Sequence, residues 1–140
     1  MAVIPAVIEP LLSILRSTQK LSSLEKASTA DEAHGVLLPY FDRNLRTMVE
    51  IYPLLAAALF SDSKRGRKLY CEQILPMIKL RSEGVRKLIK TSVDAEFVCI
   101  AGFGIEFAIA MDRFFRNRTG DLSELARKIG ELVFSDIGKK

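Results

Sequence analysis

The fold is decided by residues 95–116, AEFVCIAGFGIEFAIAMDRFFR, which are apolar on almost every side when wound into a helix. Asp94 precedes them, and its side chain can accept hydrogen bonds from the first free N–H groups of that helix. A helix that is apolar all round lies buried. We therefore predict a central helix over Ala95 to Arg116 in an all-α domain, with the carboxylate of Glu106 near its middle.

A domain of 140 residues can hardly cover every face of such a helix, and a partner subunit is the simplest cover. A sixth, amphipathic helix over about Leu122 to Ile137, capped by Asp121, would join it. Paired with their two-fold mates, these helices predict an intermolecular four-helix bundle in a homodimer. The predicted interface residues are Ala101, Gly104, Ala108, Phe115, Leu125, Ile129 and Leu132. A monomer with an apolar central helix is the alternative.

Apolar residues recur at helical spacing along the rest of the chain, and strand signals are almost absent. We expect one domain over residues 1–140 with about six helices. The four earlier helices are predicted over about Val3–Leu24, Ala30–Val49, Pro53–Phe60 and Ser63–Ile89. Prolines inside two of them, Pro39 and Pro76, predict kinks. Residues from about 1 to 93 would hold a ligand cavity, and residues from about 94 to 138 would form the dimerisation pair.

Composition narrows the class of protein. The net charge of +4 is far below that of a dedicated nucleic-acid binder. The longest apolar run, Phe97 to Met111, is interrupted by Glu106, so we expect no membrane span and a cytoplasmic protein. Cys71 and Cys99 are expected to be buried thiols. No metal-ligand spacing, nucleophile–base pair or phosphate loop occurs in the sequence, so we expect no metal, no cofactor and no enzymatic activity.

Several residues would suit a cavity for an apolar ligand, because kinked helices splay and methionines adapt to irregular shapes. The candidate ligand-binding residues are His34, Tyr40, Met48, Tyr52, Met77, Phe103, Glu106, Phe107 and Met111. The apolar members would equally suit a plain core, and His34 a helix surface. Glu106 is costly to bury unless it is paired or protonated, and it would meet Arg113 or a residue across a dimer seam.

The layout resembles the C-terminal regulatory domain of the tetracycline-repressor (TetR) family of transcription regulators. The resemblance lies in Tyr52-Pro53-Leu54-Leu55 leading into the Ser61-Asp62 break, and in the helix pair over Asp94–Arg116 and Asp121–Gly138. It implies a homodimeric ligand-sensing domain that responds to a hydrophobic small-molecule effector. The family's helix-turn-helix is not found in these residues, so DNA would be bound only through a segment that this sequence lacks. A helical protein–protein interaction module without a small ligand is the alternative.

Overall fold

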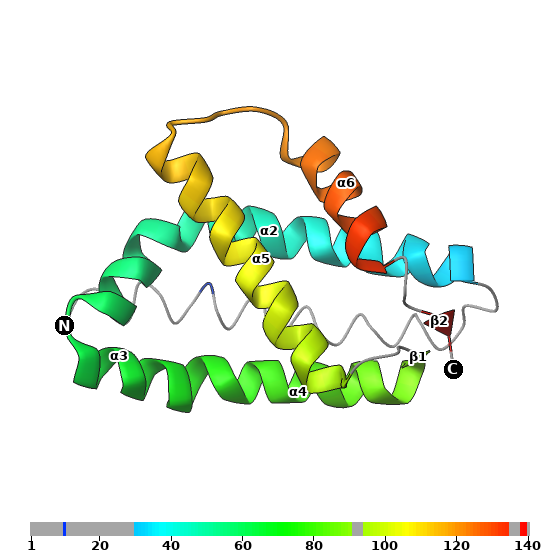
Figure 1. Cartoon of the computed structure of the whole chain (residues 1–140), viewed down its shortest axis with the longest axis horizontal. Helices are drawn as coiled ribbons and strands as arrows, with labels where there is room; N and C mark the ends of the chain where they lie inside the picture. The colour runs from blue at the N-terminus through cyan, green and yellow to red at the C-terminus, as the bar shows by residue number, and fades with distance from the viewer. Residues whose placement is uncertain (1–9, 11–29, 91–93, 135–137, 140) are drawn as a thin grey trace.

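The computed structural model describes residues 10, 30–90, 94–134 and 138–139, and within them the side chains of 10, 39–86, 94–129 and 131. The described part is all-helical, as predicted (Figure 1). Its helices are α2 (Ala30–Phe60), a continuous run of α3 (Ser63–Leu69), η2 (Tyr70–Ile74) and α4 (Leu75–Leu88), then α5 (Ala95–Phe115) and α6 (Leu122–Phe134). The helix predicted over Val3–Leu24 lies outside the described residues.

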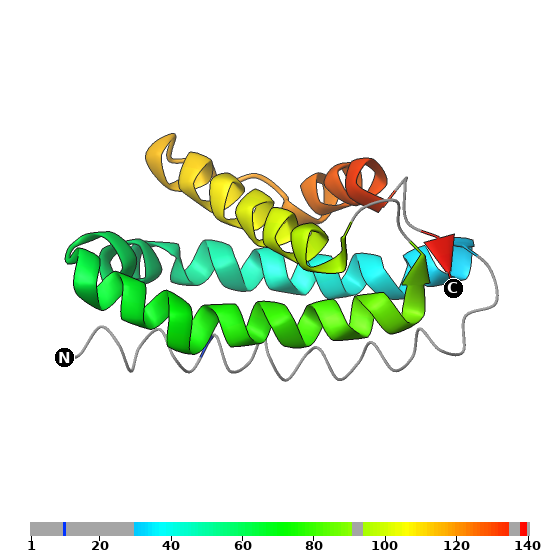
Figure 2. The same cartoon turned by 60° about the horizontal axis from the view of Figure 1, so that its bottom comes forward.

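The helices form two layers. α2 and α4 lie in one layer, and α5 and α6 lie on the same side of it (Figure 2). α5 crosses α2 and α4 and packs on both, while α6 packs on α2 (Figure 1). α5 therefore has one face on the core and another turned away from it.

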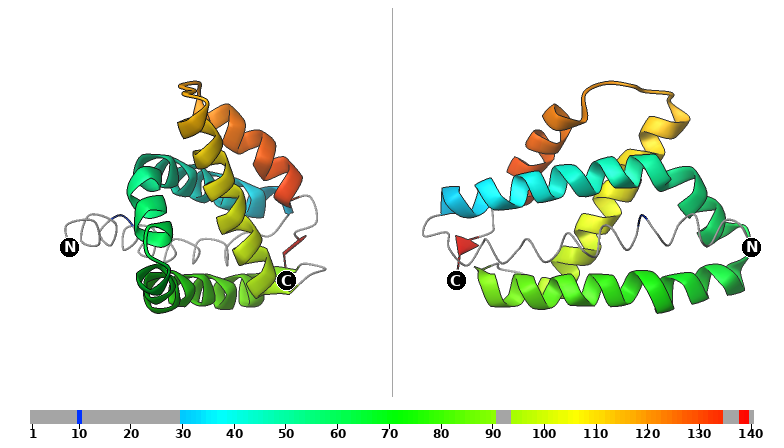
Figure 3. Two further views of the ribbon diagram at one scale, coloured as in Figure 1. Left: turned by 60° about the vertical axis from the view of Figure 1, so that its left-hand side comes forward. Right: turned by 180° about the vertical axis from the view of Figure 1, so that it is seen from behind.

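The predicted break between residues 49 and 53 is wrong, because α2 runs unbroken from Ala30 to Phe60 with Pro39 and Pro53 inside it. Proline removes one backbone donor and crowds the preceding turn, which bends a helix more often than it ends one when packing continues on both sides. Packing does continue, since Met48, Tyr52 and Leu55 are all buried. The C-terminal part of α2 turns away from the direction of the rest (Figure 3).

The helix predicted over Ser63–Ile89 is confirmed as the run from α3 to α4, with one wider turn inside it. Asp62 caps its start by accepting hydrogen bonds from the N–H groups of Lys64 at 3.0 Å and Arg65 at 3.3 Å. η2 is a π-helical turn, closed by the Leu75 N–H, which donates to the Tyr70 carbonyl. Pro76 follows directly, and the wider turn accommodates its missing donor and its ring.

The predicted start of α5 is confirmed, since the Asp94 carboxylate accepts a hydrogen bond from the Phe97 N–H at 3.1 Å. At the other end, the Arg118 N–H donates to the Arg113 carbonyl at 3.0 Å, and Asn117 has a φ of 52°. This is a Schellman-type ending, in which asparagine takes the left-handed conformation usually given to glycine.

The predicted cap of α6 is also confirmed, because Asp121 accepts a hydrogen bond from the Ser123 N–H at 2.9 Å. Its predicted end at about Ile137 lies outside the described residues, since α6 is described as far as Phe134. Gly138, expected to close this helix, lies in a strand. The two-residue strand β2 (Gly138–Lys139) pairs antiparallel with β1 (Ile89–Lys90).

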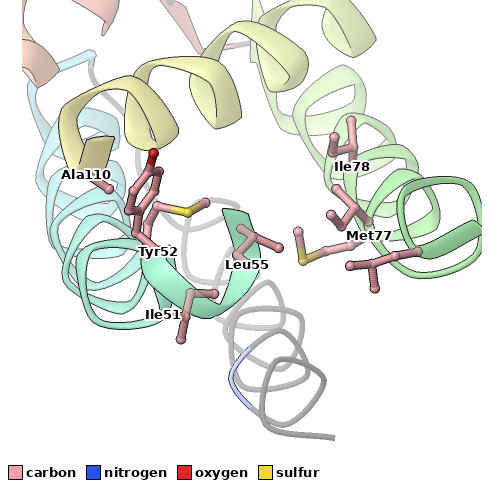
Figure 4. Packing of buried hydrophobic residues seen from close by; sticks show 9 residues of the cluster. Ile51, Tyr52, Leu55, Met77, Ile78 and Ala110 are labelled. Atoms are coloured by element: carbon pink, nitrogen blue, oxygen red, sulfur yellow. The ribbon is translucent and has the colours of Figure 1, made fainter. Parts of the chain in front are cut away.

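The main core lies where α2, α4 and α5 meet. Leu55 of α2 and Met77 of α4 point toward each other, and the Tyr52 ring lies beside Ala110 of α5 (Figure 4). The buried members of this cluster are Met48, Ile51, Tyr52, Leu55, Leu69, Ile74, Met77, Ile78 and Ala110. A smaller cluster of Phe41, Leu45 and Ala126 joins α2 to α6. These two clusters fix α5 and α6 on the α2–α4 layer.

Candidate functional site

The inner face of α5 brings together five of the nine predicted ligand-binding residues. Met48, Tyr52 and Met77 are buried, and Phe103 and Phe107 pack against them. The rings of Tyr52 and Phe107 meet edge to face, with centroids 5.1 Å apart. These five side chains thus lie together as part of the main core, and their binding of a ligand stays a prediction.

A polar cluster lies beside this apolar cluster. We define it as Tyr40 and Asn44 of α2, Arg81 of α4 and Glu106 of α5. Glu106 is only 4% exposed and Arg81 only 7% exposed. The guanidinium carbon of Arg81 lies 5.5 Å from the centroid of the Tyr40 ring, within range of a cation–π interaction. Three helices thus contribute polar groups to one buried place.

Of the two partners predicted for Glu106, Arg113 is wrong, and a residue across a dimer seam stays a prediction. Arg113 instead donates a hydrogen bond to the Gly120 carbonyl at 2.7 Å, beyond the end of α5. The charge that acts on Glu106 comes from Arg81. Arg81 was missed, although Ile74, Ile78 and Arg81 lie at helical spacing on one face of the α4 run, and that spacing predicts a buried arginine.

Burial favours the neutral form of each acid near the cluster. It raises the pKa of Glu106 to about 7, and Arg81 opposes the rise. It also raises the pKa of Tyr40, against the effects of Arg81 and Asn44. The pKa of Cys99 is raised by burial to about 11. The charge of Glu106 is therefore the one that changes near neutral pH.

The hydrogen-bonding capacity of the cluster is incompletely used. Nε and Nη2 of Arg81 are buried and have no hydrogen-bond partner among the described residues. The Tyr40 hydroxyl is buried too, and the Asn44 side chain is near enough to hydrogen-bond its ionised form and so lower its pKa. Buried polar groups in native proteins nearly always have partners, so two unpartnered donors on one guanidinium group need an explanation.

The outer face of α5 is apolar and exposed, unlike the buried polar cluster. It carries an apolar stripe, which we call the outer stripe, made of Phe97, Ile100, Gly104, Ala108, Met111 and Phe115. At 100° per residue, these positions fall within roughly 80° of the helix circumference. Phe115 is 73% exposed and Phe97 62% exposed. Met111, predicted to line the cavity, belongs to this outer stripe and is 42% exposed, so that assignment is wrong.

The other predicted residues are placed as follows. Gly104, Ala108 and Phe115 of the predicted interface are exposed and Ala101 is half-buried. Leu125 and Ile129 of α6 are half-buried, and Ile129 packs against the cluster of Phe41, Leu45 and Ala126. The side chains of His34 and Leu132 lie outside the described ones. Cys71, expected to be buried, is exposed, whereas Cys99 is half-buried.

Two classes of site are not found in the described residues. No three histidine, cysteine, aspartate or glutamate side chains there gather as ligands for a metal ion. None of the described helices is both long enough and apolar enough to cross a membrane. Comparison with protein-family models, with curated proteins and with solved structures finds no match to the chain.

Proposed function

We propose that this chain is a self-associating regulatory domain that dimerises through the outer stripe of α5 and responds to a small apolar ligand. The observation that carries the proposal is the outer stripe itself. Large apolar side chains that are exposed together on one helix mark interaction surfaces far more often than isolated ones do.

The order of residues in the outer stripe favours a second copy of the chain as the partner. The stripe is nearly symmetric in sequence about position 106. Phe97 and Phe115 lie equally far from that position, as do Gly104 and Ala108, and Ile100 and Met111 differ by only one residue. A two-fold axis through the middle of α5 would set two such helices antiparallel. Each aromatic end would then meet an aromatic end, as an isologous interface requires.

The centre of the stripe suits close packing between helices. Gly104 and Ala108 lie one turn apart and are both exposed, and nothing in the described part of the molecule lies within 4 Å of a Cβ built on Gly104. Small residues at the crossing point let two helix axes come close, so that the larger residues on either side interlock. Under this proposal the dimer depends most strongly on the residues nearest that crossing.

Sedimentation velocity and light scattering of wild-type protein and two arginine variants test the dimer. Gly104→Arg places a charged side chain at the proposed crossing and is expected to yield monomers. Gly120→Arg is the matched control, because Gly120 is also exposed with open space around a Cβ but lies outside α5. A wild type that stays monomeric at high concentration contradicts the proposal, as does a folded Gly104→Arg dimer.

The ligand-sensing part of the proposal is supported by the inner face of α5. Met48 and Met77 adapt to irregular shapes, and Phe103 and Phe107 offer flat apolar surfaces beside the polar cluster. Because one helix carries both faces, a ligand that shifts α5 on α2 and α4 would also shift the outer stripe. Differential affinity for the two positions of α5 is what a sensor requires.

The resemblance to the TetR family is the basis for proposing transcription regulation. DNA recognition would then belong to a helix-turn-helix outside these residues. The alternative is a protein–protein interaction module that uses the outer stripe with no small ligand. Ligand binding that changes the dimer dissociation constant separates the two, because the interaction module predicts no such change.

A further inference from the structure

The unpartnered donors of Arg81 form one complete edge of its guanidinium group. Nε–H and Nη2–H point the same way from the planar group, and they are the pair that grips a carboxylate through two parallel hydrogen bonds. Both nitrogens are buried without a partner among the described residues. This edge is therefore a preformed fork for a planar oxyanion.

The surroundings of this fork restrict what would fit it. The buried Tyr40 hydroxyl, beside the Asn44 side chain, adds a third donor. The apolar side chains of Phe103 and Phe107 lie on the same inner face of α5 as Glu106. Donors on one side and apolar groups on the other suit a molecule with an acceptor at one end and a hydrocarbon body.

We propose that the polar cluster binds the carboxylate of an apolar monocarboxylic acid, with Arg81 as the bidentate partner, Tyr40 as an added donor and Phe103 and Phe107 against the hydrocarbon. The inference rests on the proposed ligand-sensing function and names the chemical class of the ligand. A cationic ligand has no acceptor for these donors. A neutral alcohol offers only one oxygen, whereas the fork can donate hydrogen bonds to two.

Glu106 would take up a proton when the ligand binds, so that the ligand carboxylate is the one negative charge in the polar cluster. Its pKa of about 7 means that protonation near neutral pH is readily reached. A ligand carboxylate beside it would raise that pKa further, because like charges disfavour a second ionisation. Binding is therefore coupled to proton uptake, and affinity falls as the pH rises above 7.

Binding also requires α5 to move. The donor atoms of Arg81 and Tyr40 have almost no surface in contact with solvent in this structure. Their helices, α4 and α2, both pack on α5, so a shift of α5 on them would give a carboxylate room. The arrangement described here is then the unliganded one. Its unsatisfied donors favour the change, because the liganded arrangement satisfies them.

Calorimetry and thermal unfolding with matched probes test the assignment. The probes are decanoate, its uncharged analogue 1-decanol, and phenylbutyrate, each with the full chain. We expect both carboxylates to raise the Tm and decanol to raise it less. Arg81→Met removes the guanidinium fork and retains an unbranched apolar chain. It should weaken decanoate binding about tenfold or more and leave decanol binding unchanged. Arg81→Lys keeps the charge without the fork and should give an intermediate loss.

Two further variants complete the design. Arg86→Met is the matched control, because Arg86 is an exposed arginine on the same helix. It should bind decanoate as the wild type does. For the wild type, decanoate affinity should fall by up to about tenfold per pH unit above pH 7, and Glu106→Gln should remove that dependence.

The outcomes separate this inference from the proposed function. If carboxylate and alcohol bind equally well and Arg81→Met binds both, ligand binding stands and the carboxylate assignment is wrong. If no probe binds, the assignment and the ligand-sensing part of the proposed function are both wrong. Binding of decanoate to the outer stripe would be unaffected by Arg81→Met, so that result also overturns the assignment.

Discussion

Replacing Glu106 with glutamine should change how the stability of this protein depends on pH. The Glu106 carboxyl is 4% exposed and lies in the core of three packed helices. Water cannot solvate its charge there, and the compensation from Arg81 is incomplete, so its pKa rises from an ordinary 4.5 to about 7. Glutamine has nearly the same shape and carries no charge at any pH.

The direction and the size of the change in stability follow from this shift in the pKa of Glu106. The folded state holds the Glu106 proton more tightly than the unfolded state, so the stabilising contribution is complete below about pH 4.5. It is lost as the pH rises toward 7. A rise from 4.5 to about 7, at about 1.4 kcal/mol per pH unit, corresponds to about 3 kcal/mol. Above pH 7 this loss stays constant.

Urea unfolding from pH 4.5 to pH 8, at fixed protein concentration, measures the effect. At the low end of this range, Glu106→Gln should match the wild type in unfolding free energy. At pH 8 the variant should be more stable by up to about 3 kcal/mol. Glu83→Gln, which changes an exposed glutamate of α4, is the control and should show the pH profile of the wild type.

The opposite result would refute the reasoning. If Glu106→Gln is less stable than the wild type at pH 8, then the ionised carboxylate stabilises the fold through Arg81 and burial is not the dominant effect. Parallel pH profiles of the two proteins would show that the Glu106 carboxyl has a similar pKa in the folded and unfolded states. Either result would also remove the proton coupling expected for carboxylate binding.

Three other perturbations have clear expected results. Gly66→Ala should destabilise the fold by about 3 kcal/mol or more, because the added Cβ would overlap the Leu59 backbone carbonyl where α2 meets α3. Gly102→Ala, at a helical glycine with open space, should instead stabilise by about 0.5–1 kcal/mol in the same urea titration. In a thiol-reagent assay of the native protein, exposed Cys71 should react quickly. Cys99 should react only as the protein unfolds, because its pKa of about 11 leaves little thiolate.

The features that could be predicted from the sequence are those set by residues close together in the chain. Asp94 and Asp121 each precede an apolar periodic segment, and both cap the helices expected from them. The break expected before Pro53 failed because the cost of a proline within a helix was offset by side chains far away in sequence. Met48 and Leu55, on either side of it, pack into one core cluster with Met77 of α4.

The polar cluster could be predicted only in part, for a different physical reason. The position of Glu106 in an apolar helix marks it as a buried carboxylate, and that expectation holds. Its partner depends on which helix crosses α5 at that level, and helical periodicity contains no such information. Arg113 was one of the two predicted partners, beside a residue across a dimer seam, because it lies two turns away along the same helix. Arg81 acts on the charge of Glu106 from another helix, α4, which packs on α5.

The position of Glu106 links the two faces of α5. Two residues along an α-helix correspond to a rotation of roughly 200°, so Gly104 and Ala108 both lie nearly opposite Glu106. The proposed crossing point of the dimer is thus directly behind the carboxylate whose charge changes near pH 7. A proton or a ligand that changes the charge of Glu106 acts on the turn of α5, residues 104–108, where the second copy would come closest. If both proposals are correct, the dimer dissociation constant should depend on pH in the wild type and not in Glu106→Gln.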